Sequence, residues 1–202
     1  FAFNNENADY VLITNNDVKV DSSVISELVK VAYKDSLIGF VTGKVYYFDE
    51  PDILQTTGYE LINEKYWLFD HRGGNEKDNG QYNKFEELEY TDDIFMLVSK
   101  KVYQDTKGYD IEFQFQAEQM DWQIRAKKMG FSVFYTPYAK ILHKESMTIG
   151  KASTFKTFYN VRNMLVLVLM HKDNGFIKRY LMWYLPNQVI KPLIKALLKR
   201  KN

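Results

Sequence analysis

A short apolar run that stops at three consecutive polar side chains constrains the fold of this sequence more than any other feature. Residues 10–14, Tyr-Val-Leu-Ile-Thr, are apolar and rich in β-branched side chains, which is typical of a buried strand. Residues 15–17, Asn-Asn-Asp, follow directly, and Asp or Ser at 21–23 can cap a helix. A strand, a polar turn and a helix in this order predict an α/β fold, in which ligands bind where strands end.

The rest of the chain continues this alternation before it becomes helical. Further strands are expected over residues 38–48, 94–98, 131–135 and 139–142. Helices are expected over residues 24–32, 100–106 and 118–129. Residues 70–84 are polar and rich in Gly and Asn, which predicts a loop. We therefore expect one α/β unit in residues 1–150 and a helical extension in residues 151–202.

The charge of the chain is unevenly distributed. Residues 172–202 carry a net charge of +7, and the remaining residues carry −6. A basic tail predicts an anionic partner surface, either a membrane or a nucleic acid. We favour a membrane, with no nucleic-acid partner, because nucleic-acid binding explains neither residues 15–17 nor the aromatic-apolar runs. The sequence contains no cysteine, which excludes disulfides and thiolate metal sites and fits a reducing compartment.

The tail has the pattern of a helix that lies on a membrane surface. Residues 192–201 place Leu193, Ile194, Leu197 and Leu198 on one face, with lysines at 191, 195 and 199 on another. The longest apolar run, residues 164–170, is much shorter than the roughly 18 residues that a membrane span needs. The alternative is that these helices pack on the α/β unit and the lysines form a solvated face.

Polar side chains at three places in the sequence are candidates for metal binding or catalysis. They are residues 15–17, the pair Glu118 and Asp121 at a predicted helix start, and His143 after the last predicted strand. A carboxylate and an imidazole can hold Mg²⁺ or Mn²⁺ and through it a diphosphate, and acids three residues apart share a helix face. Ordinary structural explanations also exist, namely turn formation, helix capping and a structural histidine.

The order of these motifs resembles the family 2 glycosyltransferases of bacteria, which have the GT-A fold. The segment ADYVLITNNDVKVDSSVISELV is similar to their strand that ends in a DXD-type metal motif, and GKVYYFDEPDILQTTGYEL is similar to the segment after it. The segment from residue 95 to 146 resembles their acceptor-side region, with an E-D-x-D motif before a strand and a histidine. FYNVRNMLVLVL is similar to the opening of their trailing helices. The resemblance covers nearly the whole chain.

This resemblance implies a Rossmann-like mixed sheet flanked by helices and an inverting sugar transfer. The donor would be a nucleotide-diphospho-sugar, and the acceptor a hydroxyl of a glycan or lipid-linked molecule in cell-surface polysaccharide synthesis. The implied location is the cytoplasm, at the inner face of the plasma membrane. Asp17 would bind Mn²⁺ or Mg²⁺ with Asn15 and Asn16 nearby, and His143 would be a later metal or phosphate ligand. Arg125 would contact substrate.

One departure from the family pattern concerns the general base. The position that supplies this base in the family is Gln119, and an amide does not accept a proton at neutral pH. Glu118, Asp121 or the adjacent pair Asp92 and Asp93 are the expected replacements near the substrate. The alternative is a silenced domain with a binding or scaffolding role at the membrane. A nucleotidyltransferase on a similar fold is a third option.

A second departure is at the start of the chain. The family opens with a strand, a loop and a helix that hold the nucleotide base, whereas this sequence begins near the end of that region. We therefore expect an N-terminally incomplete domain.

Overall fold

The computed structural model of the chain describes residues 2–5, 7–144 and 154–199. It contains a seven-stranded sheet of order β1-β8-β3-β9-β2, in which β4 also pairs with β3 and β7 with β9. The strands of this sheet are β1 (Tyr10–Thr14), β2 (Val18–Val20), β3 (Ile38–Tyr47), β4 (Leu54–Thr56), β7 (Glu86–Leu88), β8 (Phe95–Ser99) and β9 (Ser132–His143). A separate hairpin consists of β5 (Tyr59–Asn63), the short turn η1 (Glu64–Tyr66) and β6 (Leu68–His71).

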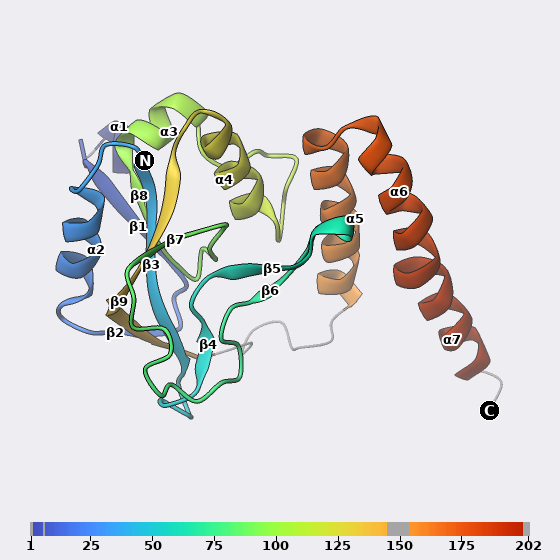
Figure 1. The fold of residues 1–202 in the computed structure, drawn as a ribbon, viewed down its shortest axis with the longest axis horizontal. Helices are drawn as coiled ribbons and strands as arrows, with labels where there is room; N and C mark the ends of the chain where they lie inside the picture. The colour runs from blue at the N-terminus through green and yellow to red at the C-terminus, as the bar shows by residue number, and fades with distance from the viewer. Residues whose placement is uncertain (1, 6, 145–153, 200–202) are drawn as a thin grey trace.

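The helices lie on both faces of the sheet and beyond one side of it (Figure 1). They are α1 (Ala2–Asn5), α2 (Val24–Ala32), α3 (Lys100–Thr106), α4 (Glu118–Lys128), α5 (Thr154–His171), α6 (Asn174–Tyr184) and α7 (Lys191–Lys199). A π-helical segment, η2 (Leu185–Ile190), joins α6 to α7. In Figure 1, α2 covers one face, α3 and α4 cover the other, α5 stands next to α4, and α6 and α7 lie beyond α5. The predicted mixed α/β architecture is confirmed.

The two faces of the sheet are apolar because the strand side chains alternate in direction. In β8, Phe95 and Leu97 pack in the core beneath α2, whereas Met96 and Val98 pack in the core beneath α3 and α4. A strand that is buried on both faces reads as a continuous apolar run. This is why residues 94–98 were recognisable as a strand from sequence.

Strand β9 corrects the prediction of two strands on either side of Thr136-Pro137. The structure has one strand, Ser132–His143, which pairs in parallel with β3 along its length. The register jumps between the pairs Thr42↔Tyr135 and Lys44↔Lys140, so one residue of β3 lies opposite four of β9. That residue is Gly43, where a Cβ would lie 2.1 Å from the carbonyl oxygen of Ala139. Only glycine allows this close approach, so the bulge in β9 requires Gly43.

The long polar loop predicted at residues 70–84 is anchored to the sheet by a buried lysine. Lys44 in β3 is 1% exposed, and its Nζ donates to Asp78 Oδ2 at 2.5 Å and to Asn83 Oδ1 at 2.8 Å. Burial raises the pKa of Asp78, but hydrogen bonds from Lys44 and Tyr46 outweigh that effect and lower it to about 2. The loop is therefore bonded to the sheet through ionised partners.

A third apolar core joins the C-terminal helices to the rest of the fold. It contains Ile124 of α4, Leu167 of α5, Tyr180 of α6 and Trp67 from the β5–β6 hairpin. Within the described residues, no helix combines the length and apolarity that a membrane crossing needs. In this third core, α5 and α6 pack against α4 and the hairpin.

Candidate functional site

A cavity of about 720 Å³ lies between the sheet end, the start of α4, the β5–β6 hairpin and the C-terminal helices. It brings together eight of the ten side chains predicted from sequence. These eight are Asn15, Asn16, Asp17, Asp92, Asp93, Glu118, Gln119 and His143. Asp121 and Arg125 do not line it.

The pair of Asp17 and His143 lies where β1 and β9 end. Strand β2 pairs with β9 so that Val18 lies opposite His143, which brings the preceding residue, Asp17, to the same place. The carboxylate Oδ1 of Asp17 is 3.2 Å from Nε2 of His143, and Nδ2 of Asn15 is 3.1 Å from the same nitrogen. Two segments 126 residues apart in sequence therefore form one polar cluster at the edge of the sheet.

The other ring nitrogen of His143 is held by Gln55 of β4. His143 Nδ1 lies 2.7 Å from Gln55 Oε1, and both side chains are buried. An amide oxygen only accepts hydrogen bonds, so this contact places a proton on Nδ1 and leaves Nε2 to accept from Asn15 Nδ2 or to bind a cation beside Asp17. Histidines that bind metals are oriented in this way by a partner on their second nitrogen.

The cluster fits a metal ion that is shared with a ligand. In the described part of the chain, no three His, Asp or Glu side chains are grouped closely enough to hold a metal by themselves. Asp17 and His143 provide one carboxylate and one imidazole. Divalent cations that bind nucleotides typically take one or two protein ligands and fill the other positions with phosphate oxygens and water. The residues present fit that arrangement.

Two acids on the opposite wall of the cavity are poorly solvated. Burial raises the pKa of Asp93, and the adjacent Asp92 carboxylate raises it further. Burial also raises the pKa of Glu118, and the nearby charge of Asp93 raises it by a smaller amount. Oε2 of Glu118 is buried and has no hydrogen-bond partner among the described residues. Acids with raised pKa values in a cavity are characteristic of functional sites.

A strained turn presents the start of α4 to the cavity. Gln116 and Ala117 have φ values of 65° and 69°. This is a left-handed backbone conformation that residues other than glycine rarely adopt. The fully buried Asn163 of α5 stabilises this turn, because its Nδ2 donates to the carbonyl oxygens of Phe115 and Gln116, each at 2.7 Å. This contact gives a structural role to Asn163, the last residue of the FYNVRN motif. Its position in the sequence gave no indication of its partner.

Asp121 and Arg125 connect helices and do not face the cavity. Asp121 is fully buried, with Oδ2 2.8 Å from Arg125 Nη2 and Oδ1 2.8 Å from His171 Nε2. Burial raises the pKa of Asp121, but the bonds from His171 and Arg125 outweigh it and leave the pKa below its usual value. Arg125 also donates to the carbonyl oxygens of Thr106 and Gly108. The structure therefore gives both side chains a role in joining helices, and their places in the catalytic and substrate-binding sets stay predictions.

Several cavity residues were not identified from sequence. Tyr59 and His71 come from the hairpin, and Tyr180 and Tyr184 come from α6. The hydroxyl of Tyr180 is buried and has no hydrogen-bond partner among the described residues. No local pattern distinguishes these side chains, because only the tertiary packing of distant elements brings them together.

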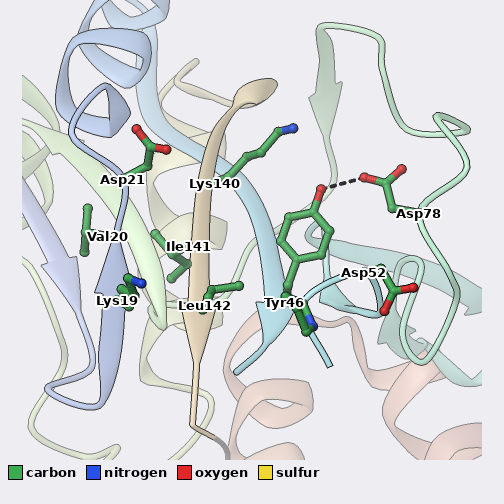
Figure 2. Close-up of a pocket in the computed structure, with 10 residues that line it drawn as sticks. Lys19, Val20, Asp21, Tyr46, Asp52, Asp78, Lys140, Ile141 and Leu142 are labelled. Carbon is green, nitrogen blue, oxygen red and sulfur yellow. Dashed lines mark hydrogen bonds between the residues drawn. The ribbon is translucent and has the colours of Figure 1, made fainter. Parts of the chain in front are cut away.

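A second cavity contains none of the predicted site residues. It has a volume of about 490 Å³ and is lined by residues of β2, β3, β9 and the polar loop. Figure 2 shows Tyr46 pointing at Asp78 across it, with their hydrogen bond of 2.5 Å. Lys19 and Lys140 also line it, and of its three acids Asp78 is already paired with Lys44 and Asp52 with Lys77. The first cavity is therefore the candidate functional site.

Comparisons with known proteins agree with the predicted fold. No protein-family model matches the sequence, and no curated protein matches it either. Among solved structures, the chain is similar to GalNAc-T7, a GT-A glycosyltransferase whose crystal structure contains UDP, GalNAc and Mn²⁺. The TM-score is 0.51 at 10% identity, over 93% of this chain and 41% of that chain. The chain therefore has a GT-A fold.

We expect Glu118→Gln to stabilise the protein at neutral pH. Because the pKa of Glu118 is raised by folding, the unfolded chain ionises first, and the folded state loses stability as pH rises past the normal pKa. The variant should therefore have a higher Tm at pH 7 to 8. This difference should vanish below about pH 4, where glutamate is protonated in both states.

Thermal denaturation of both proteins across this pH range measures the effect. Glu50→Gln, at an exposed position outside the cavity, controls for the change of charge. A lower Tm for Glu118→Gln at neutral pH would show that the ionised carboxylate is stabilised in the fold.

Proposed function

We propose that this protein is an inverting glycosyltransferase that uses a nucleotide-diphospho-sugar as donor. The observation that supports this most strongly is the pairing of Asp17 with His143 at the sheet edge of a GT-A fold. The cavity beside this pair, at about 720 Å³, is within the usual size range of small-molecule sites, roughly 300–1,000 Å³. The acceptor is a hydroxyl group of a glycan or lipid-linked molecule in cell-surface polysaccharide synthesis.

The donor diphosphate belongs beside Asp17 and His143, with Asn15 and Asn16 as neutral polar contacts. A divalent cation there, Mn²⁺ or Mg²⁺, supplies positive charge that stabilises the departing diphosphate. The rest of the cavity, between Glu118 and the hairpin, has room for the sugar and the acceptor. In an inverting transfer, the acceptor oxygen attacks the anomeric carbon from the side opposite the diphosphate, and its proton passes to a base.

A specific observation favours the alternative of a silenced domain with a binding or scaffolding role. Gln119 lines the cavity at the position where the family places its base, and its Oε1 is buried without a partner among the described residues. General-base catalysis is worth about 10²–10⁴-fold in rate. If no other group accepts the proton, the site retains nucleotide binding and loses turnover.

We expect a nucleoside diphosphate to stabilise the protein in a way that needs both Mn²⁺ and Asp17. A ligand at about 100 times its Kd adds roughly 2.7 kcal/mol to the free energy of unfolding. For a chain of this length, each kcal/mol raises Tm by about 2–4 °C. Thermal denaturation with UDP, dTDP and GDP, each with and without Mn²⁺, measures this shift in the wild type and in Asp17→Ala.

Asp52→Ala, which alters the second cavity only, is the matched control and should keep the full shift. A shift of equal size in Asp17→Ala, or no shift with any nucleotide, would contradict the proposed donor site.

We also propose that the C-terminal helix attaches the protein to an anionic membrane surface, at the cytoplasmic face of the plasma membrane. In α7, Leu193, Ile194 and Leu198 are 58%, 49% and 61% exposed, and Lys191 and Lys195 are exposed on the same helix. Exposed leucines and lysines on one short helix match the chemistry of a membrane interface. The side chain of Leu197 is outside the described residues.

Replacing both Leu193 and Leu198 with Ser should abolish flotation with liposomes that contain phosphatidylglycerol. The wild type should float with these liposomes, less well at high salt, and poorly with neutral phosphatidylcholine alone. Ile62→Ser, at an exposed apolar position in the hairpin, is the matched control. Equal flotation of the double variant and the wild type would refute this role for α7.

A further inference from the structure

We propose that His71, oriented by Asp92, is the general base of the transfer in place of the residue at position 119. This inference rests on the proposed function, because it names the proton acceptor that an inverting transfer requires. His71 is the last residue of β6 and lines the same cavity as Asp17, Glu118 and His143. Its side chain is 40% exposed, so an acceptor that enters the cavity can reach it.

Asp92 binds His71 and Tyr59 at the same time. Oδ2 of Asp92 is 3.0 Å from Nδ1 of His71, and Oδ1 accepts a hydrogen bond of 2.6 Å from the Tyr59 hydroxyl. The register of the hairpin places Tyr59 opposite His71, and their rings stack with centroids 5.0 Å apart. The Tyr59 ring thus covers one face of the imidazole, and a buried carboxylate lies against one of its nitrogens.

This arrangement matches a known chemical design for a base. A buried carboxylate that lies against one imidazole nitrogen stabilises the imidazolium that forms when the ring accepts a proton. Histidine also has an ordinary pKa close to neutral pH, where a general base is most effective. Tyr59 is the donor to Asp92, because burial and then the Asp92 charge raise its pKa well above the ordinary value.

Position 119 belongs to the same network. Gln119 lowers the pKa of Tyr59, against the larger raising effects of burial and Asp92, and Tyr59 donates to Asp92. All four residues line the cavity, and Asp92 links Tyr59 to His71 within it. An amide at position 119 supports the orientation of this network, and the proton-accepting group is the imidazole.

In the proposed step, the acceptor hydroxyl oxygen forms a bond to the anomeric carbon as the bond from that carbon to the diphosphate oxygen breaks. The electron pair of the broken bond leaves with the nucleoside diphosphate. The hydroxyl proton passes to Nε2 of His71, while Nδ1 keeps its contact with Asp92. The imidazolium then releases its proton to water, which restores the base.

Glu118 is the competing candidate for this role. It lines the same cavity, and its raised pKa would also suit proton transfer. Among the described residues, however, Glu118 has no group of opposite charge against it, whereas His71 lies 3.0 Å from the Asp92 carboxylate. An experiment must therefore separate these two residues.

The test measures nucleotide release from UDP-glucose, UDP-galactose and dTDP-rhamnose, with Mn²⁺ and octyl galactoside or water as acceptor. We expect His71→Ala to lower kcat by about 10²–10⁴-fold, and added imidazole to restore part of that loss. His71→Asn serves as a second variant if His71→Ala does not fold. Asp92→Asn, a positioning residue, should lower kcat with little change in donor KM and should not respond to imidazole. Glu60→Gln, on the opposite face of β5, should behave as the wild type.

Three outcomes would overturn the inference. The first is a folded His71 variant with nearly wild-type kcat. If Glu118→Gln is inactive in the same assay, the proposed function stands with Glu118 as the base. The second is a loss of activity in His71→Ala that imidazole does not restore. The third is no release by the wild type from any donor. In that case, the Tm shift of the same protein samples with UDP and Mn²⁺ shows whether the proposed donor site binds a nucleotide.

Discussion

The parallel pairing of β3 with β9 is the interaction on which the rest of this structure depends. It runs from Ile38↔Ser132 to Tyr47↔His143, and it continues across a bulge only because Gly43 lets the Ala139 carbonyl approach. The pairing delivers His143 to the sheet edge, where β2 brings Asp17 beside it. Backbone hydrogen bonds and one close approach therefore determine the position of the two side chains that we propose as ligands of a metal-bound diphosphate.

Around that edge, the fold places three separate groups of titratable side chains. Asp17 and His143 lie on the sheet, Asp93 and Glu118 share a poorly solvated wall, and the hairpin holds His71 against Asp92. The C-terminal helices close the cavity and also stabilise it, because Asn163 bonds the strained turn before α4. Removal of these helices would thus alter the site as well as any attachment to a membrane.

Sequence reasoning succeeded where local signals decide the structure. The apolar run of β1 and the helices expected over residues 100–106 and 118–129 correspond to elements that the structure contains. It failed where pairing is non-local, so β4, the hairpin, His71 and Gln55 were not recognised. A spacing of three residues predicts a shared helix face but not what that face meets, which is why Asp121 was assigned to the site although it binds Arg125 and His171.

The central claim is that Asp17 and His143 together hold a cation bound to a nucleoside diphosphate. Electron–nuclear double resonance of Mn²⁺ with the protein and UDP tests it most directly, because it detects nuclei bonded to the metal. The account predicts phosphorus couplings from UDP and a nitrogen coupling from one histidine, with the nitrogen coupling lost in His143→Ala. Phosphorus couplings with no nitrogen coupling, or a nitrogen coupling that persists in His143→Ala, would contradict it.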